Sequence, residues 1–185
     1  FSLMYADKSL RNDKNFILSA LKVCNWGTFF EFVGKKLKKD KEVVLKAVKQ
    51  WGMALQFVDK TFKKDKQIVT SAVRQYCNSL EHADESLKKN PKIVIEAIKQ
   101  NGYALKYAHN DLKNNRSFII KSVRINGNSL SYADEKFRSD KEIVLEAVKQ
   151  NGNAIIHASK QLRDDKEIAL EAVKNNCFTI QHLNK

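Results

Sequence analysis

The side chains best suited to chemistry form a column of aromatic rings and imidazoles that recurs about every 25 residues. Aromatic faces can stack on the bases of a single-stranded nucleic acid, and neutral imidazole is a common zinc ligand. The column consists of Tyr5, Phe32, Phe57, His82, Tyr107, Tyr132, His157 and His182. On a helical wheel it lies about 60° outside the apolar stripe, where a ring packs against the next unit and keeps its polar edge in water. We therefore expect a structural role for these rings.

A metal site at the histidines is not expected. His157 and His182 lie one unit apart. Because stacked helices are about 8–10 Å apart, this pair needs a third ligand to hold zinc. No other His or Cys is placed to supply that ligand. The sequence predicts no metal.

Catalytic motifs are also absent from the sequence. It contains no glycine-rich phosphate loop, no HExxH and no GxSxG. Its recurring aspartates are explained as helix caps or surface residues, whereas catalysis needs a constellation that occurs once. We expect no catalytic residues, no cofactor and no small-molecule substrate, and therefore no enzyme.

Basic side chains give the strongest signal beyond the repeat. Stacked units would align them into ridges able to contact phosphates or carboxylates. Alternatively they form an ordinary solvated face, since Glu142, Glu146 and Lys149 stand at helical pairing distances. The first basic column is Lys38, Lys63, Lys88, Lys113, Arg138 and Arg163; the second is Lys41, Lys66, Arg116, Lys141 and Lys166; the third is Lys49, Arg74, Lys99, Arg124, Lys149 and Lys174. The first column, with Lys49, Arg74, Lys99 and Arg124, is the candidate binding ridge.

The net charge is positive and uneven along the chain. Lys and Arg number 34 against 21 Asp and Glu, a net charge of +13. Residues 1–50 carry 11 basic and 5 acidic side chains, whereas residues 151–185 carry 5 and 4. We expect an acidic partner, if one binds, to contact mostly the N-terminal units.

Two further columns define the helices that carry these side chains. Each Asp or Asn precedes about ten residues without a breaker and then a Gly, which is the N-cap and C′ pattern of a short helix. Pro91 directly follows Asn90, at the first helical position. The polar column is Asp40, Asp65, Asn90, Asn115, Asp140 and Asp165, and the second is Gly27, Gly52, Cys77, Gly102, Gly127, Gly152 and Cys177. Residues 41–51 and their equivalents are therefore predicted to be helical.

A second helix is predicted after each Gly, for example over residues 128–137, where Leu130, Ala133 and Phe137 share one face. In the helix of residues 41–51 the apolar positions cover about 200° of arc, so it must pack between neighbours. Two short antiparallel helices per 25 residues predict an all-α fold, an α-solenoid. Residues 1–185 are expected to form one array of about seven units, as part of a longer chain.

The composition agrees with this fold and indicates in which cellular compartment the protein is expected. One Pro and six Gly leave few breakers, which disfavours a strand-and-turn architecture. No apolar run is long enough to span a bilayer, so no membrane insertion is expected. Cys24, Cys77 and Cys177 are widely separated and are predicted to be small core residues of a protein from a reducing, intracellular compartment.

The recurring phrase D-K-E-x-V-L-x-A-V-K-Q-N-G-x-A-L-x-Y-A-D-x-x-L resembles the repeat family known as domain of unknown function 4116. Matching stretches are DKEVVLKAVKQWGMALQFVDKTF, NPKIVIEAIKQNGYALKYAHNDL and DKEIVLEAVKQNGNAIIHASKQL. Cys77 and Cys177 depart from the Gly column, and the first unit carries a two-residue insertion. The resemblance implies repeated helical modules within larger microbial proteins and supplies no catalytic residues.

Three functions are compatible with this sequence. The favoured one is a non-catalytic protein-interaction or scaffold module, since solenoids present long surfaces. The second is an RNA-binding or ribonucleoprotein-associated array that uses its basic ridge against phosphates. The third is the docking region of an enzyme or effector whose catalytic domain lies elsewhere. The residues after each Gly, from Thr28 to Phe178, are interpreted as helix starts and not as base readers.

Overall fold

The computed structural model describes residues 2–23 and 27–182 and divides into two compact units, Phe1–Lys88 and Lys89–Lys185. The single array expected for residues 1–185 stays a prediction. The α-helices of the first unit are α1 (Lys8–Asn12), α2 (Lys14–Val23), α3 (Lys41–Gln50), α4 (Lys66–Gln75) and α5 (Glu85–Lys88). Its 3₁₀ helices are η1 (Ser2–Tyr5), η2 (Gly27–Phe32), η3 (Leu37–Lys39), η4 (Gly52–Gln56), η5 (Phe62–Lys64) and η6 (Cys77–His82).

The second unit repeats the same order of elements. Its long helices are α6 (Pro91–Gln100), α8 (Arg116–Ile125), α10 (Lys141–Gln150) and α12 (Lys166–Asn175). Its short α-helices are α7 (Asn110–Lys113), α9 (Glu135–Arg138) and α11 (Lys160–Arg163). Its 3₁₀ helices are η7 (Gly102–Tyr107), η8 (Gly127–Tyr132), η9 (Gly152–His157) and η10 (Cys177–His182).

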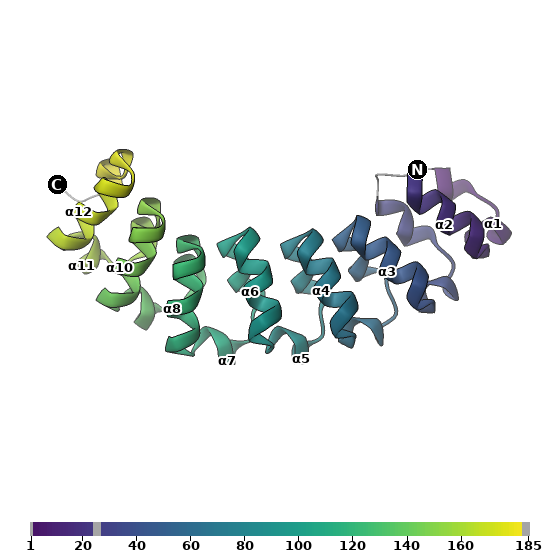
Figure 1. Ribbon diagram of the computed structural model, residues 1–185, viewed down its shortest axis with the longest axis horizontal. Helices are drawn as coiled ribbons and strands as arrows, with labels where there is room; N and C mark the ends of the chain where they lie inside the picture. The colour runs from purple at the N-terminus through teal and green to yellow at the C-terminus, as the bar shows by residue number, and fades with distance from the viewer. Residues whose placement is uncertain (1, 24–26, 183–185) are drawn as a thin grey trace. The chain divides into compact units, whose positions relative to one another are not determined.

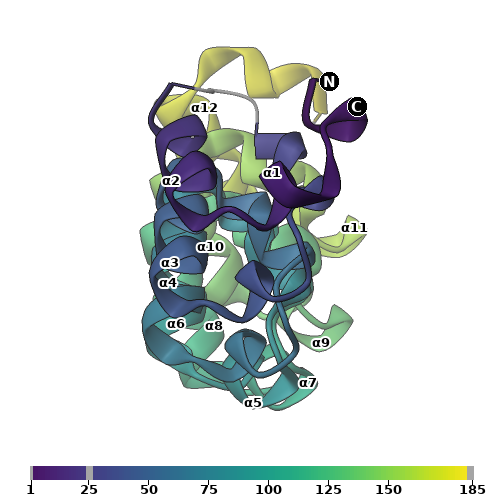
Figure 2. The same ribbon diagram turned by 90° about the vertical axis from the view of Figure 1, so that its right-hand side faces the viewer.

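Long helices pack side by side in both units. Figure 1 shows α2, α3 and α4 in succession in the first unit, and α6, α8, α10 and α12 in succession in the second. Figure 2 shows α7, α9 and α11 to one side of the long helices of the second unit. Helices dominate the described residues, which contain no strand. Each unit is thus all-α, as predicted, and consists of stacked α-solenoid repeats.

The predicted N-caps start the long helices. The Asp140 Oδ1 atom accepts a hydrogen bond from the Ile143 amide at 3.2 Å, and Asn115 Oδ1 accepts one from Phe118 at 3.0 Å. Pro91 occupies the first turn of α6, as expected for a residue without an amide hydrogen. The Asp and Asn column therefore fixes where each long helix begins.

The glycine column has a different role from the predicted one. No glycine among the described residues has a positive φ, so these glycines do not form the left-handed C′ cap. A Cβ atom on Gly127 would lie 2.5 Å from the Ala147 carbonyl oxygen, and one on Gly152 would lie 2.5 Å from the Ala172 oxygen. At these repeats glycine therefore permits a close approach of the next long helix, whereas the repeat that starts η6 accommodates the Cys77 side chain at the same position.

The second predicted helix of each repeat is broken into two pieces. Over residues 128–137, the 3₁₀ helix η8 ends at Tyr132 and α9 begins at Glu135. Ala133 between them is extended, with φ −72° and ψ 152°. Asp134 then caps α9, because its Oδ1 atom accepts a hydrogen bond from the Lys136 amide at 3.1 Å. This second cap in the repeat interrupts the helix.

The core follows the predicted apolar faces. Leu130, Ala133 and Phe137 are buried, and Ala97 and Ala147 have no exposed surface. Full burial of a residue as small as alanine leaves room for the neighbouring backbone, which explains the close contact with the glycines.

Amide side chains that the sequence analysis did not single out join successive repeats of the second unit. Gln150 Oε1 accepts a hydrogen bond from the Gly127 amide at 2.5 Å, and Asn175 Oδ1 accepts one from Gly152 at 2.7 Å. Asn151 Nδ2 donates to Asn128 Oδ1 at 2.8 Å. The bonds to Gly127 and Gly152 satisfy the amide groups at the start of η8 and η9.

The cysteines differ in environment. Cys77 is a buried free thiol, as expected for a small core residue, and burial raises its pKa. Cys177 is exposed in the described residues, contrary to the prediction that it is a small core residue. Cys24 lies outside the described residues. In the part of the chain that the structure covers, no helix has the length and apolar character needed to cross a membrane.

Candidate functional site

The first basic column lies half-buried on the short helices of each repeat. Lys38 Nζ donates a hydrogen bond to the Glu31 carbonyl at 2.5 Å, and Lys63 Nζ donates one to the Gln56 carbonyl at 3.1 Å. Burial lowers the pKa of Lys38. The half-buried members are Lys38, Lys63 and Lys88 in the first unit and Lys113, Arg138 and Arg163 in the second. This column is therefore only partly accessible to a binding partner.

The aromatic column lies beside these basic groups. Lys38 Nζ is 5.8 Å from the centre of the Phe57 ring of the next repeat, within the range of a cation–π contact. Burial lowers the pKa of His157, and the nearby charge of Arg138 lowers it further. Burial also lowers the pKa of His82. Phe57, His82 and His157 thus pack near basic groups of their own unit, which supports a structural role for these three rings.

Several members of the second basic column form ion pairs with the N-cap aspartate of the next repeat. Lys41 Nζ lies 2.6 Å from Asp65, and Lys141 Nζ lies 2.9 Å from Asp165. The hydrogen bond from Lys141 lowers the pKa of the Asp165 carboxyl group. Arg116 pairs in the same way with Asp140, whereas Lys66 and Lys166 are exposed. Much of this column joins neighbouring repeats instead of facing solvent as free charge.

The third basic column is neutralised in the second unit. Lys99 Nζ lies 2.9 Å from Glu96, and Lys174 Nζ lies 3.7 Å from Glu171. Glu146 pairs with Lys149 at 3.3 Å on its own helix and with Arg124 of α8 at 2.6 Å. Each of these basic groups therefore has a carboxylate partner in place.

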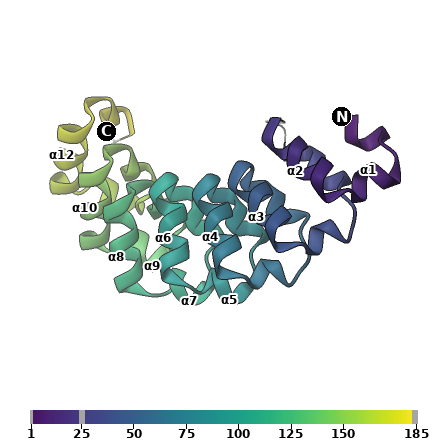
Figure 3. The ribbon, with the colours of Figure 1, turned by 45° about the vertical axis from the view of Figure 1, so that its right-hand side comes forward.

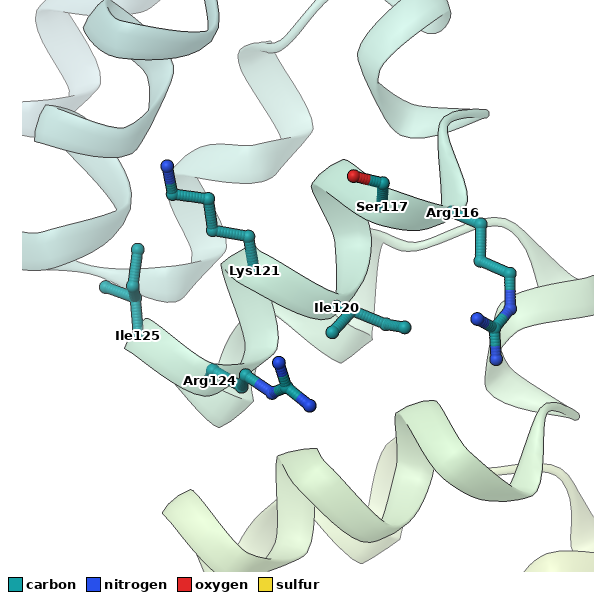
Figure 4. Close-up of a pocket in the computed structure, with 6 residues that line it drawn as sticks. All are labelled: Arg116, Ser117, Ile120, Lys121, Arg124 and Ile125. Atoms are coloured by element: carbon teal, nitrogen blue, oxygen red, sulfur yellow. The ribbon is translucent and has the colours of Figure 1, made fainter.

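The two arginines that line a hollow along α8 are also paired with carboxylates. Figure 4 shows its lining, with Arg116 and Arg124 directed to one side of the helix and Lys121 to the other. The Arg116 guanidinium also lies 2.6 Å from Glu142 of α10. Both arginines are thus occupied by carboxylates of α10, and Lys121 is left without an ion-pair partner among the described residues.

The third basic column is different in the first unit. Lys22 and Lys49 are exposed, and Lys46 is half-buried on the solvent side of α3. None of the three has a carboxylate partner among the residues that the structure describes. The glutamate position of the second unit is occupied here by Ser19, Lys46 and Ser71. Arg74 of α4, in the same column, is exposed but does have an interaction partner.

Most exposed large apolar side chains of the second unit lie on its 3₁₀ helices, and Leu170 of α12, which is 57% exposed, is the exception among the described residues. Tyr103 and Tyr132 are 40% and 43% exposed, Ile156 is 41% exposed and Phe178 is 76% exposed. The Tyr103 ring makes edge contacts with the Tyr132 ring at 6.1 Å and with the His157 ring at 6.3 Å between centres. We call the contacting rings of Tyr103, Tyr132 and His157 the aromatic face.

Tyr132 and His157 belong to the aromatic column that the sequence shows, whereas Tyr103, like Phe178, stands at the variable position after the Gly column and was not expected to join them. The interpretation of Tyr103 and Phe178 as helix starts is correct. The Tyr103 amide donates to Asn101 Oδ1 at 3.0 Å, and the Phe178 amide donates to Asn176 Oδ1 at 3.1 Å. The backbone at this position is thus used as a cap, while the side chain is free to vary.

Metal binding finds no support in the described residues, which contain no group of three or more His, Cys, Asp or Glu side chains that could hold an ion. His157 belongs to the aromatic face, and the side chain of His182 lies outside the described residues.

The repeat seen in the structure coincides with the matches of a family model, described as a domain of unknown function (DUF4116). It matches residues 1–38, 23–63, 40–88, 65–113, 90–138, 115–163 and 140–185. The chain belongs to the DUF4116 family. Five of the matches start at N-cap residues 40, 65, 90, 115 and 140, so each spans about two repeats of this DUF4116 chain. Comparison with curated proteins and with solved structures finds no match.

Proposed function

We propose that this DUF4116 chain is a non-catalytic protein-interaction module that serves as a scaffold within a larger protein or assembly. The observation that carries the proposal is the aromatic face of the second unit. The polar groups that recur in every repeat are used as caps, ion pairs and links between repeats. The rings of Tyr103 and Tyr132 take no part in these caps, ion pairs and links, and each ring residue is more than one third exposed.

Such a surface fits a protein partner. Tyrosine is enriched at protein interfaces and among the residues that dominate binding, because it buries a large area while its hydroxyl group keeps a polar partner. A contiguous exposed apolar patch is likewise a mark of an interaction site. The net positive charge of both units, with 17 basic against 10 acidic side chains in Phe1–Lys88 and 17 against 11 in Lys89–Lys185, favours a partner with an acidic surface.

RNA binding is the second candidate function. The observation that favours it is the absence of carboxylate partners around Lys22, Lys46 and Lys49 in the described part of the first unit. Phosphates would satisfy these groups as well as carboxylates do.

One capture experiment separates the two candidates. The immobilised chain is exposed to cell extract with and without ribonuclease, and bound proteins are identified by mass spectrometry. We expect a protein that survives ribonuclease and is lost when Tyr103 and Tyr132 are both changed to Ser. Tyr76→Ser in the first unit is the matched control, since Tyr76 is 43% exposed. A bound set that disappears with ribonuclease would favour RNA binding.

A further inference from the structure

The aromatic face extends over three successive repeats of the second unit. Tyr103 belongs to η7, Tyr132 to η8 and His157 to η9. Figure 3 shows α6, α8 and α10, the long helices that precede η7, η8 and η9 in the chain, in succession along this unit. The plane of the Tyr103 ring stands at 88° to the planes of both other rings. A ligand that follows the face therefore passes from one repeat to the next.

Two asparagine side chains add hydrogen-bond donors to the same three repeats. Asn128 and Asn153 hold in η8 and η9 the position that Tyr103 holds in η7. Asn128 Oδ1 accepts a hydrogen bond from Asn151 Nδ2 at 2.8 Å, and Asn153 Oδ1 accepts one from Asn176 Nδ2 at 3.0 Å. Because the oxygen atoms are used in this way, the Nδ2 groups of Asn128 and Asn153 remain as donors, and neither has an acceptor among the described residues.

The first unit uses the corresponding donor internally. Asn78 stands at the same repeat position, and its Nδ2 atom donates a hydrogen bond to the Tyr76 hydroxyl oxygen at 3.1 Å. The repeat therefore folds with this amide group occupied or unoccupied, and the second unit leaves it to an external acceptor.

Arg138 supplies a positive charge beside the aromatic face. Burial and, after it, the charge of Arg138 lower the pKa of the His157 imidazole, which places the two side chains near each other. The guanidinium group has no carboxylate partner in the part of the chain that the structure describes, and its buried Nε atom has no hydrogen-bond partner. Arg116 and Arg124 of the same unit are both paired with carboxylates. An acidic side chain of a ligand would give Arg138 the partner that these arginines have.

The spacing of the repeats indicates the conformation of the ligand. Packed helices are about 8–10 Å apart, so equivalent groups such as Asn128 and Asn153 recur at about that step. Groups on one side of a β-strand recur every second residue, at about 6.6 Å. In a polyproline II helix they recur every third residue, at about 9.3 Å, and the backbone makes no internal hydrogen bonds. A polyproline II segment therefore keeps in step with the repeats and has free carbonyl groups for the asparagine donors.

A single-stranded nucleic acid fits this surface less well. Its bases stack on the faces of aromatic rings, and the perpendicular planes of Tyr103 and Tyr132 do not form a row of parallel faces. Its phosphates also need a series of basic groups, whereas Arg124 and Lys149 of this unit are already paired with Glu146. The observations favour a polypeptide ligand.

We propose that the aromatic face, together with Asn128, Asn153 and Arg138, binds a proline-rich segment of a partner protein in the polyproline II conformation, with an acidic residue beside the prolines. This inference rests on the proposed protein-interaction function and names the kind of segment that is bound. The tyrosine rings pack against proline rings, the asparagine amides donate to carbonyl groups three residues apart, and the arginine pairs with the acidic side chain. Such a segment is already extended before binding, so little conformational freedom is lost.

The test is the binding of a labelled peptide of repeated Pro-Pro-Glu, about four turns of polyproline II long, measured by fluorescence anisotropy. A peptide of repeated Gly-Gly-Glu with the same length and charge is the comparison, because it is flexible and has no proline rings. We expect the proline peptide to bind at least about tenfold more tightly at the same salt concentration. Equal binding of the two peptides, or no binding of the proline peptide, overturns the proposal.

Two variants locate the binding site. Asn128→Asp replaces the Nδ2 donor by an acceptor and keeps the oxygen that accepts from Asn151, so we expect a folded chain that binds the proline peptide about tenfold more weakly. Asn78→Asp is the matched control, since it makes the same charge change at the same repeat position of the first unit, and binding should stay within about twofold of the parent. The Tyr103→Ser, Tyr132→Ser chain should lose binding.

Equal binding of the proline peptide by the Asn128→Asp and Asn78→Asp chains contradicts the proposal, as does unchanged binding by the tyrosine variant. Oligouridylate of equal charge that binds tenfold more tightly than the proline peptide, and is lost in the tyrosine variant, assigns the surface to nucleic acid instead.

These outcomes are distinct from failure of the proposed function. If the proline peptide does not bind while a captured protein is still lost in the Tyr103→Ser, Tyr132→Ser chain, the module binds protein through its aromatic face but not through a polyproline II segment. If no captured protein depends on the tyrosines either, both proposals fail.

Discussion

Replacing Gly127 by Ala tests why the repeat keeps glycine at this position. The added Cβ atom would lie 2.5 Å from the Ala147 carbonyl oxygen and 3.1 Å from both Asn151 Cβ and Gln150 Oε1. An ordinary contact begins at 3.4 Å, so η8 and α10 must separate by about 0.9 Å. The obstacle is backbone, which cannot rotate away as a side chain can.

The expected cost follows from three contributions. Overpacking a closely packed interface costs about 1–3 kcal/mol. The hydrogen bond from the Gly127 amide to Gln150 is strained, which adds up to about 1 kcal/mol. The reduced freedom of the unfolded chain offsets about 0.4–1 kcal/mol. The net loss is about 2 kcal/mol, and the melting midpoint should fall by about 4–8 °C for a chain of this size.

Thermal unfolding, followed by circular dichroism, measures this loss of stability. Ser117→Ala, at an exposed position of α8, is the control variant and should melt at the temperature of the parent chain. Gly127→Asn discriminates between the two explanations of the glycine column. Asparagine tolerates positive φ better than alanine does, so a C′ cap would make Asn the milder change. Close approach makes Asn at least as damaging as Ala. An Asn variant clearly more stable than the Ala variant, or an Ala variant that melts within a degree of the parent, would refute our reasoning.

Three further predictions concern stability. Ala147→Leu should cost about 1–3 kcal/mol in chemical denaturation, because the residue is fully buried between helices; an unchanged midpoint would show that the position has space. Asp140→Ala should cost about 1 kcal/mol by loss of the α10 cap, whereas Asp140→Asn should keep most of it, since Asn caps equally well. The lowered pKa of His157 means that the unfolded chain binds its proton more readily, so stability is lost as the pH falls from about 6.5 through the folded pKa. His157→Gln should reduce that loss in pH-dependent melting, and an identical pH profile in the two chains would contradict it.

The repeat and its helix starts were predictable because they depend on local chemistry. Asp140 and Asn115 cap the helices that follow them, and Pro91 begins one, as their types require. Burial of Leu130 and Ala147 followed from helical spacing alone. Features set within about one helical turn can be recognised without knowing the neighbouring repeat.

Features that depend on the neighbouring repeat were not predictable in the same way. The glycine pattern suits a C′ cap and a close contact equally, and only the position of the Ala147 carbonyl separates them. In the sequence the basic columns look alike. In the structure Lys141 forms an ion pair with Asp165 of the next repeat, whereas Lys38 donates a hydrogen bond to the Glu31 backbone carbonyl. The exposure of the Tyr103 side chain also depends on how the repeats stack. The residue type at this position differs from repeat to repeat, so the sequence pattern does not indicate its environment.

The central claim is that this DUF4116 chain recruits a protein through the exposed side chains that its repeats do not use. The most direct measurement is the recovery of partner from ribonuclease-treated extract by the Tyr103→Ser, Tyr132→Ser chain relative to the Tyr76→Ser chain. Loss of two interface tyrosines should reduce recovery at least about tenfold, while the Tyr76 control keeps the recovery of the parent. Equal recovery by all three chains would contradict the claim.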